Sequence, residues 1–346
     1  MPVINATAYP IWGNALIFAA AAAIIWFSGR KLTKYLDAIA LKTGLDHAFV
    51  GMLLLGGITS LPEVANAVTS ASIGNPALAV NNLLGSAAIN VLLLAIVDAF
   101  VGRKAVTSIV ARPSTMMMSA LCMIILVMIA TAITIGDVLI GPVGAGSVFI
   151  GAISISSFWL AAGHDQRSPW AIVKDEDGNP DDGEDKDLPD LRVASLWLRV
   201  AFHGALIFAS GYALSQTGDA IATQAGLSSA VVGFALIGTA TSLPELVTIV
   251  AALKLGRPEM AFGQVLGTNF VNLSLIPLAD LFFSGEPVLN MLGDFEVVSA
   301  LLGATVIGVF MVGLLEHRDR TIWKMGVDSA AVIAIFAAGT FLLATI

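Results

Sequence analysis

Charged side chains are scarce in this chain. Asp, Glu, Lys and Arg make up 12% of its 346 residues, whereas soluble domains carry about 25%. Hydrophobic residues make up 57%, and the mean hydropathy is +0.88. These values exclude an ordinary soluble globular protein and are typical of a polytopic membrane protein, so the lipid bilayer is the first partner that we expect.

Cysteine and positive charge are also lacking. Cys122 is the single cysteine, which excludes a disulfide within the chain. The net charge of -8 argues against nucleic acid as a partner. The sequence has no Walker loop, no dinucleotide fingerprint and no His-Glu-x-x-His motif. We therefore expect no enzyme and no cofactor, and no feature points to an obligate protein partner.

Long hydrophobic stretches predict the fold. A helix crosses the hydrocarbon core with about 20 apolar residues, and no strand-like alternation persists along the chain. We therefore predict an all-α membrane protein with ten transmembrane helices. The predicted spans are 11–28, 48–72, 78–100, 114–134, 139–161, 195–216, 228–253, 260–283, 297–315 and 322–344.

The basic residues predict the orientation of these spans. All 17 Lys and Arg residues lie in or beside the connections that follow spans 1, 3, 5, 7 and 9. By the positive-inside rule these connections are cytoplasmic, and both termini are outside. The start of the chain lacks the basic region of a signal peptide, so 11–28 is expected to be a retained span in the plasma (inner) membrane.

One hydrophilic stretch divides the chain. Residues 175–185 read Asp-Glu-Asp-Gly-Asn-Pro-Asp-Asp-Gly-Glu-Asp. We predict a five-helix repeat over 1–162, an acidic cytoplasmic linker over 163–194 and a second five-helix repeat over 195–346. The linker is interpreted as flexible, with a regulatory cation-binding loop as the alternative.

The two halves contain the same segment. Gly44–Asp98 aligns without a gap to Gly226–Asp280, at an offset of 182, with 21 identities in 55 positions. Because each half has an odd number of spans, the second copy crosses the membrane in the opposite direction. Such inverted repeats are the build of secondary transporters, which place the substrate site between the halves.

Both copies contain Thr-Ser-Leu-Pro-Glu, at 59–63 and 241–245. A carboxylate is costly in a bilayer and indicates a functional site. Within each motif, threonine and glutamate share a helix face, as Thr59 does with Glu63 and Thr241 with Glu245. Pro62 and Pro244 free a backbone carbonyl, and glycines just upstream, including Gly56 and Gly238, allow the helix to open. Oxygen ligands of this kind suit Ca²⁺ or Na⁺.

The following span of each half adds polar side chains near its middle. Ser86 and Asn90 share one face, and Thr268 and Asn272 share another. Around a common centre, two ionised glutamates carry a charge of -2, which one Ca²⁺, two Na⁺ or two protons neutralise. The alternative is that these polar side chains hold helices together.

Asp98 and Asp280 lie near the far ends of the same two spans. We interpret them as solvated helix ends, with a cation vestibule as the alternative.

These motifs resemble the cation/calcium antiporter family, and within it the prokaryotic sodium/calcium exchanger branch. The resemblance rests on four segments: Gly-x-x-Thr-Ser-Leu-Pro-Glu at 56–63, Thr-Ala-Thr-Ser-Leu-Pro-Glu at 239–245, Gly-Ser-Ala-Ala-Ile-Asn at 85–90 and Gly-Thr-Asn-Phe-Val-Asn at 267–272. The repeats cover 110 residues, and the five-plus-five layout extends the likeness over the chain.

The resemblance implies a set of ligands. Ca²⁺ would lie between Glu63 and Glu245, with oxygens from Thr59 and Thr241. Na⁺ sites would use side chains and carbonyls around it, and alternating access would come from sliding of spans 1 and 6. The implied Na⁺ ligands and central amides are Ser60, Ser242, Ser86, Thr268, Asn90, Asn272 and the carbonyls near Gly56 and Gly238.

Two departures from the family pattern concern the counter-ion. Exchangers of this branch commonly carry aspartate at one central position, but here both Asn90 and Asn272 are amides. Ala87 replaces the usual asparagine of Gly-Ser-Asn. We therefore expect Ca²⁺/Na⁺ antiport, with H⁺/Ca²⁺ (or another cation/H⁺) antiport as the runner-up. A passive cation channel and an intramembrane enzyme are further alternatives.

Overall fold

The computed structural model describes residues 6–72, 74–101, 113–162, 191–225, 241–316, 321–322 and 325–346. Gly238 and most of the acidic linker lie outside these ranges. The described residues are mainly helical. The long helices are α1 (Ile11–Thr43), α5 (Pro76–Val101), α7 (Pro113–Ile135), α8 (Ala145–Ala162), α9 (Val193–Gln224), α13 (Pro258–Ser274), α15 (Asp294–Glu316) and α16 (Val327–Leu343).

Shorter elements complete the described part of the chain. They are the 3-10 helices η1 (Ala6–Ala8) and η5 (Val288–Met291), the π-helix η2 (Val50–Leu55), and the helices α2 (His47–Phe49), α3 (Gly56–Thr59), α4 (Leu61–Ser72), α12 (Leu243–Lys254) and α14 (Ile276–Phe282).

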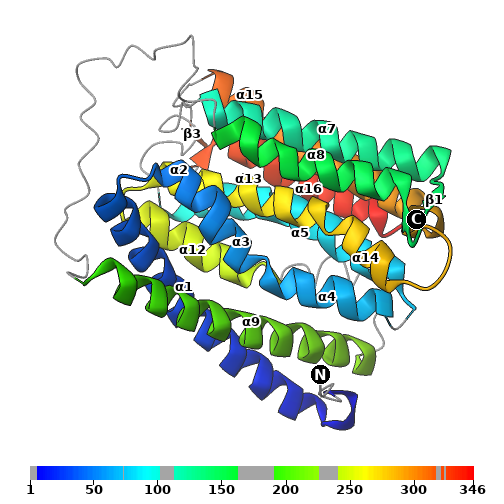
Figure 1. Ribbon diagram of the computed structural model, residues 1–346, viewed down its shortest axis with the longest axis horizontal. Helices are drawn as coiled ribbons and strands as arrows, with labels where there is room; N and C mark the ends of the chain where they lie inside the picture. Colours follow the sequence, from blue (N-terminus) through cyan, green and yellow to red (C-terminus); the bar gives the residue numbers. More distant parts are fainter. Residues whose placement is uncertain are drawn as a thin grey trace.

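The helices form three layers (Figure 1). Helices α1 and α9 pair with each other along one side of the molecule, and α7, α8, α15 and α16 cover the opposite side. Helices α4, α5, α12, α13 and α14 lie between them. The predicted site residues belong to this middle layer, which places the site between a two-helix pair and a four-helix scaffold.

Length and composition identify several membrane-spanning candidates. Within the described ranges, six helices are long and apolar enough to cross a membrane, and the bent pair His47–Thr59 and Leu61–Ser72 makes seven. Helix α1 continues to Thr43, so the basic residues assigned to the connection after 11–28 lie within this helix. The chain is thus a helical membrane protein.

Two short hairpins correct the expectation of a purely helical chain. Strands β1 (Leu139–Ile140) and β2 (Val143–Gly144) pair antiparallel just before α8, and β3 (Thr321–Ile322) and β4 (Met325–Gly326) pair just before α16. The predicted spans 139–161 and 322–344 therefore begin with these hairpins, and their helices start several residues later, at Ala145 and Val327. Two-residue strands are too short to give the alternation that predicts a strand.

The internal repeat extends to these elements. Where both copies are described, the helices and strands of the first half recur 182 positions later, with their ends matching within one residue. The pairs are α1 with α9, α4 with α12, α5 with α13 and α14 together, α7 with α15, β1–β2 with β3–β4, and α8 with α16. The sequence identity of one segment therefore belongs to a structural repeat that continues beyond it, through the described helices and hairpins of both halves.

Asp98 and Asp280 are buried, so the interpretation as solvated helix ends is wrong; their exposed fractions are 1% and 2%. Asp98 accepts a hydrogen bond from the Gly326 backbone N–H at 2.7 Å, and Asp280 accepts one from the Gly144 N–H at 2.8 Å. Asp280 and Gly326 are the repeat equivalents of Asp98 and Gly144. Such reciprocal contacts are the pattern of two-fold related surfaces. Each aspartate thus anchors the hairpin of the other half.

Removing the Asp280 carboxylate should destabilise the protein. It accepts hydrogen bonds from the N–H groups of Gly144 and Val288 and from the Ser147 hydroxyl. Asp280→Ala leaves the two backbone N–H donors without this acceptor, at a cost of about 1–3 kcal/mol each, whereas the Ser147 hydroxyl can still donate to Asp137 Oδ2 at 3.3 Å. The melting temperature in detergent should fall clearly, and fall less for Asp280→Asn, which keeps an acceptor. An unchanged melting temperature for Asp280→Ala would contradict the anchoring role.

The two halves differ in how the outer helix pair lies on the middle layer. Gly211 of α9 packs on Pro62, because a Cβ at Gly211 would lie 2.4 Å from the Pro62 Cγ. The equivalent Gly29 of α1 packs on Val247, since a Cβ there would lie 2.9 Å from its Cγ1. Val247 comes three residues after Pro244, the equivalent of Pro62. With a rise of 1.5 Å per residue, the two contacts differ by about 4.5 Å along the helix axis.

Candidate functional site

The first motif lies at a break in a helix. Helix α3 ends at Thr59 and α4 begins at Leu61, and the two parts of this span are bent by 41°. Pro62 cannot donate a backbone hydrogen bond to Ile58, which explains why the chain breaks here. This confirms the prediction of an opened helix in the first motif. The second motif is described from Thr241 onward, with Ser242 just before α12.

The two glutamates lie together at the centre. Glu63 and Glu245 are fully buried and near enough to each other for their charges to interact. The side chain of Thr241 lies beside Glu63, and that of Thr59 lies beside Glu245. Each glutamate therefore lies beside the threonine of the other repeat.

The carboxylates are poorly satisfied by the protein. Ser86 Oγ is 3.5 Å from Glu63 Oε1. Glu63 Oε2 and both carboxylate oxygens of Glu245 accept no hydrogen bond from the described residues. Buried charges are normally paired or bound to metal ions, so this arrangement leaves oxygens available for a cation.

Hydroxyl groups of the first motif direct their protons away from the site. Thr59 Oγ1 donates to the Leu55 carbonyl at 3.0 Å, and Ser60 Oγ donates to the Gly56 carbonyl at 2.9 Å. Their oxygens retain lone pairs, as cation ligands require. Gly56 also allows α3 to approach α13, because a Cβ there would lie 2.9 Å from the Thr268 backbone nitrogen.

Helices α5 and α13 bury the predicted polar turns in the middle layer. Ser86, Asn90, Thr268 and Asn272 have no exposed surface. Several polar atoms on these helices and in the second motif have no hydrogen-bond partner among the described residues. They are Asn90 Oδ1, Thr268 Oγ1, both amide atoms of Asn272, and Ser242 Oγ.

Asn269 contacts the segment in which Ala87 replaces the asparagine of the family pattern. Its Nδ2 donates to the Ala87 carbonyl at 3.2 Å, and its Oδ1 accepts from Asn90 Nδ2 at 3.1 Å. Ala87 and Asn269 are repeat equivalents, so this contact lies close to the pseudo-two-fold axis. One amide thus links both helices at the centre of the site.

The donor set is made of oxygen atoms and contains few carboxylates. In the described ranges, no group of three or more His, Cys, Asp and Glu residues is placed to hold a metal ion. Two carboxylates with neutral hydroxyl and amide oxygens suit a hard cation and not zinc or copper.

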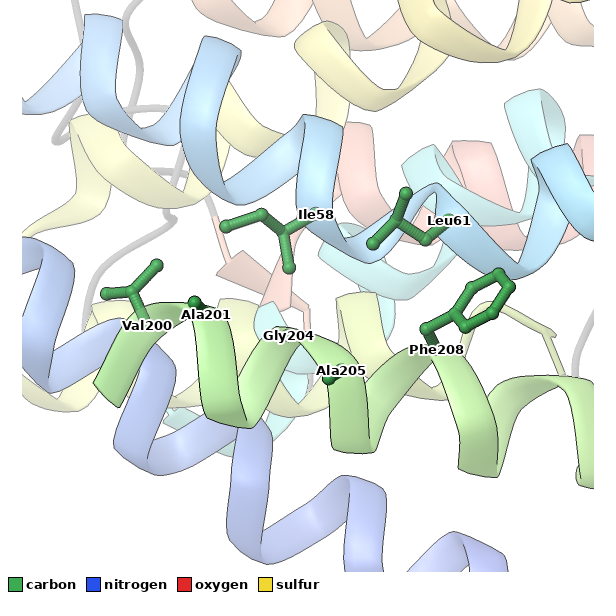
Figure 2. Close-up of a pocket in the computed structure, with 7 residues that line it drawn as sticks. All are labelled: Ile58, Leu61, Val200, Ala201, Gly204, Ala205 and Phe208. Atoms are coloured by element: carbon green, nitrogen blue, oxygen red, sulfur yellow. The ribbon is translucent and has the colours of Figure 1, made fainter. Parts of the chain in front are cut away.

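An apolar cavity of about 370 Å³ lies between the helix break and α9. Figure 2 shows Ile58 and Leu61, on either side of the break, opposite the face of α9 that carries the other lining residues. These are Val200, Ala201, Gly204, Ala205 and Phe208. None of the side chains that line the cavity is polar, so they provide no ligand for a cation. The cavity does leave space into which α9 could shift.

Sequence reasoning missed two residues of the site. Asn82 and Gln264 have no exposed surface and precede Ser86 and Thr268 by four residues, so they lie on the same helix faces. Asn82 Oδ1 accepts a hydrogen bond from Thr241 Oγ1 at 3.4 Å. The signal was present in the sequence, because the polar residues of each helix recur every four positions.

The sequence profile of the sodium/calcium exchanger protein family matches residues 13–162 and again 195–344. The chain belongs to the sodium/calcium exchanger family. The resemblance drawn from the motifs is therefore confirmed. The starts of the two matched segments are 182 positions apart, as are the paired structural elements. Membership identifies the chain as a transporter of the exchanger type rather than an enzyme.

Named relatives of this exchanger-family chain are distant. It is 25% identical to inner membrane protein YrbG of Escherichia coli over 260 residues, which cover 73% of this chain and 74% of YrbG. It is 42% identical to sodium/calcium exchanger MaX1 of Methanosarcina acetivorans over 59 residues, which cover 17% of each chain.

The fold of the exchanger-family chain also matches a solved structure. The sodium-calcium exchanger NCX_Mj, soaked with Na⁺ and Sr²⁺, superposes with a TM-score of 0.66 at 16% identity, covering 97% of this chain and 99% of that one. At this identity the match shows the fold.

Proposed function

We propose that this protein is a secondary antiporter that exchanges Ca²⁺ for Na⁺ by alternating access. The observation that supports this most is the pair of buried glutamates, Glu63 and Glu245. Each lies beside the threonine of the other repeat, and three of their four carboxylate oxygens accept no hydrogen bond from the part of the chain that the structure describes. A pair of ionised carboxylates is neutralised by one Ca²⁺ or by two Na⁺. Because the two loads compete for the same oxygens, the site supports exchange.

The proposed ligands are the residues of the two motifs and of the facing helices. Glu63, Glu245, Thr59 and Thr241 would hold Ca²⁺. Na⁺ would use oxygens of the same centre, and no other cofactor is required. The remaining proposed ligands are Ser60, Ser242, Ser86, Thr268, Asn90, Asn272 and the carbonyls near Gly56 and Gly238.

The proposed architecture is ten spans in two inverted five-helix repeats, 1–162 and 195–346, joined by an acidic linker. The shared offset of paired elements and the reciprocal Asp98 and Asp280 contacts support it. We place the protein in the plasma membrane with both termini outside and the linker in the cytoplasm, because every Lys and Arg falls at connections of one side.

The proposed transport step is a shift of α1 and α9 over the middle layer. Two observations support it. The contacts of Gly29 and Gly211 differ by about 4.5 Å between the halves, and the apolar cavity leaves α9 space beside the helix break. Exchange of the two contact patterns would turn the site toward the opposite side of the membrane.

Proton-coupled Ca²⁺ transport is the second candidate. Asn90 and Asn272 leave two carboxylates at the centre, which two protons neutralise as well as two Na⁺. Ca²⁺ flux in proteoliposomes under an imposed Na⁺ or H⁺ gradient decides between them. We expect uptake driven by the Na⁺ gradient. Uptake driven by the H⁺ gradient alone would refute Na⁺ coupling, and flux that needs no counter-ion would indicate a channel.

A further inference from the structure

Asn82 and Gln264 extend the polar faces of α5 and α13 away from the centre. On α5 the face consists of Asn82, Ser86 and Asn90, spaced by four residues. On α13 the equivalent face begins with Gln264. Both amides are fully buried. In a membrane-spanning helix a buried polar side chain marks a substrate or ion path, or pairs with another polar group.

Each amide also keeps one polar atom without a partner. Asn82 Nδ2 and Gln264 Oε1 make no hydrogen bond to the described residues. The assignment of oxygen and nitrogen in an amide follows its hydrogen bonds, so a rotated Asn82 would present its oxygen instead. An amide oxygen is a ligand for Ca²⁺ and Na⁺, so each of these side chains has a group that can bind a cation.

The bonded atom of each amide contacts the glutamate region of the second repeat. Asn82 accepts from Thr241, whose side chain lies beside Glu63. Gln264 Nε2 donates to Thr248 Oγ1, and Thr248 lies on α12 one turn after Glu245. Each amide therefore contacts a threonine that lies next to one of the two glutamates, in space or along α12.

The two amides lie on opposite sides of the centre. Helices α5 and α13 run antiparallel in the middle layer (Figure 1), and they meet at Asn90 and Asn269. Asn82 precedes Asn90 by eight residues, or about 12 Å toward the start of α5. Gln264 lies toward the start of α13, which is at the other end of the molecule.

We propose that Asn82 and Gln264 are entry ligands, each of which binds the transported cation as it approaches the centre from its own side of the membrane. The inference rests on the proposed function. It predicts that each amide affects Ca²⁺ affinity on one side of the membrane only. A ligand at the centre binds cations that arrive from either side, whereas an entry ligand binds those that arrive from its own side.

The test measures the half-saturating Ca²⁺ concentration of exchange in right-side-out and in everted membrane vesicles. We expect Asn82→Ala to raise it roughly tenfold on one side and Gln264→Ala to raise it roughly tenfold on the other, since a bond to a charged partner is lost. Asn82→Asp and Gln264→Glu preserve size and add charge, and each should lower the value on its own side.

Asn81→Ala is the matched control. Asn81 is the neighbouring buried amide on α5, and its Oδ1 also has no hydrogen-bond partner among the described residues. Its Nδ2, however, donates to Glu296 Oε1 of α15 at 2.8 Å, whereas Asn82 and Gln264 bond to threonines next to the glutamates. Loss of Asn81 should therefore shift neither side selectively. Suppose that the wild type exchanges cations but the Asn82 and Gln264 variants change the half-saturating Ca²⁺ concentration equally on both sides, or on neither side. That result would overturn this inference and leave the proposed function standing. A wild type without cation exchange would overturn the proposed function and this inference with it.

Discussion

Glu63→Gln should abolish Ca²⁺ exchange while making the cation-free protein more stable. Glu63 is fully buried and close to Glu245, and its Oε2 has no hydrogen-bond partner within the described ranges. A buried carboxylate of this kind costs free energy when no cation is bound. The amide has the same shape without the charge, so it removes this cost together with the attraction for Ca²⁺.

The expected loss of exchange at subsaturating Ca²⁺ is about 30-fold or more, because losing one partner of a buried charge pair costs about 2–5 kcal/mol and 1.4 kcal/mol is tenfold. Radiolabelled Ca²⁺ uptake in proteoliposomes measures it. The melting temperature in detergent with a chelator should rise relative to wild type, and added Ca²⁺ should raise it no further. Retained exchange would refute the role of Glu63 as a ligand.

Glu296→Gln is the matched control for this variant. Glu296 is also buried, with 6% of its surface exposed, but its oxygens accept from Asn81 Nδ2 at 2.8 Å and from the Gly293 N–H at 2.7 Å. The amide keeps only one acceptor, so the cation-free protein should become less stable while exchange persists. Opposite signs of the two stability changes separate a cation ligand from a structural carboxylate.

The central residues of the site could be predicted from the sequence because their cost is visible there. A carboxylate and a proline inside an apolar stretch stand out without any knowledge of packing. Because the motif recurs at a fixed offset in the second half, the sequence also predicts that Glu63 and Glu245 lie close together. Likewise, Asn90 and Asn272 stand out as amides within long apolar helices.

Other features depend on contacts that a sequence pattern does not contain. Asp98 and Asp280 read as helix ends, and only the fold reveals that each accepts a backbone hydrogen bond from a hairpin of the other half. The hairpins themselves are two residues per strand, below the length at which alternation is readable. Asn82 and Gln264 were within reach, but their roles depend on Thr241 and Thr248 lying across from them.

The difference between the halves was also beyond sequence reasoning. Equivalent glycines predict equivalent contacts, yet Gly211 packs on Pro62 and Gly29 packs on Val247. Two halves with equivalent sequences can therefore differ in how their first helix packs on the middle layer. In an inverted repeat, exchange of those arrangements exchanges the side to which the site is open.

A disulfide between Gly29→Cys and Val247→Cys should stop exchange completely and reversibly. A Cβ at Gly29 lies 3.3 Å from the Val247 Cβ, near the separation of about 3.5–4.5 Å found in disulfides. The Val247 substitution also removes the Cγ1 atom that a side chain at residue 29 would otherwise meet. Cys122 is buried and should not compete.

The cross-link holds α1 in its present contact with α12, and a shift of about 4.5 Å along the axis would separate the two sulfur atoms. Exchange should fall to background after oxidation and return after reduction, while each single-cysteine variant exchanges under both conditions. Ca²⁺ should still bind the cross-linked protein, because Gly29 and Val247 lie outside the ligand set. Cross-linked protein that exchanges at the wild-type rate would show that transport proceeds with this contact intact, and the shift of α1 over α12 would then have no part in it.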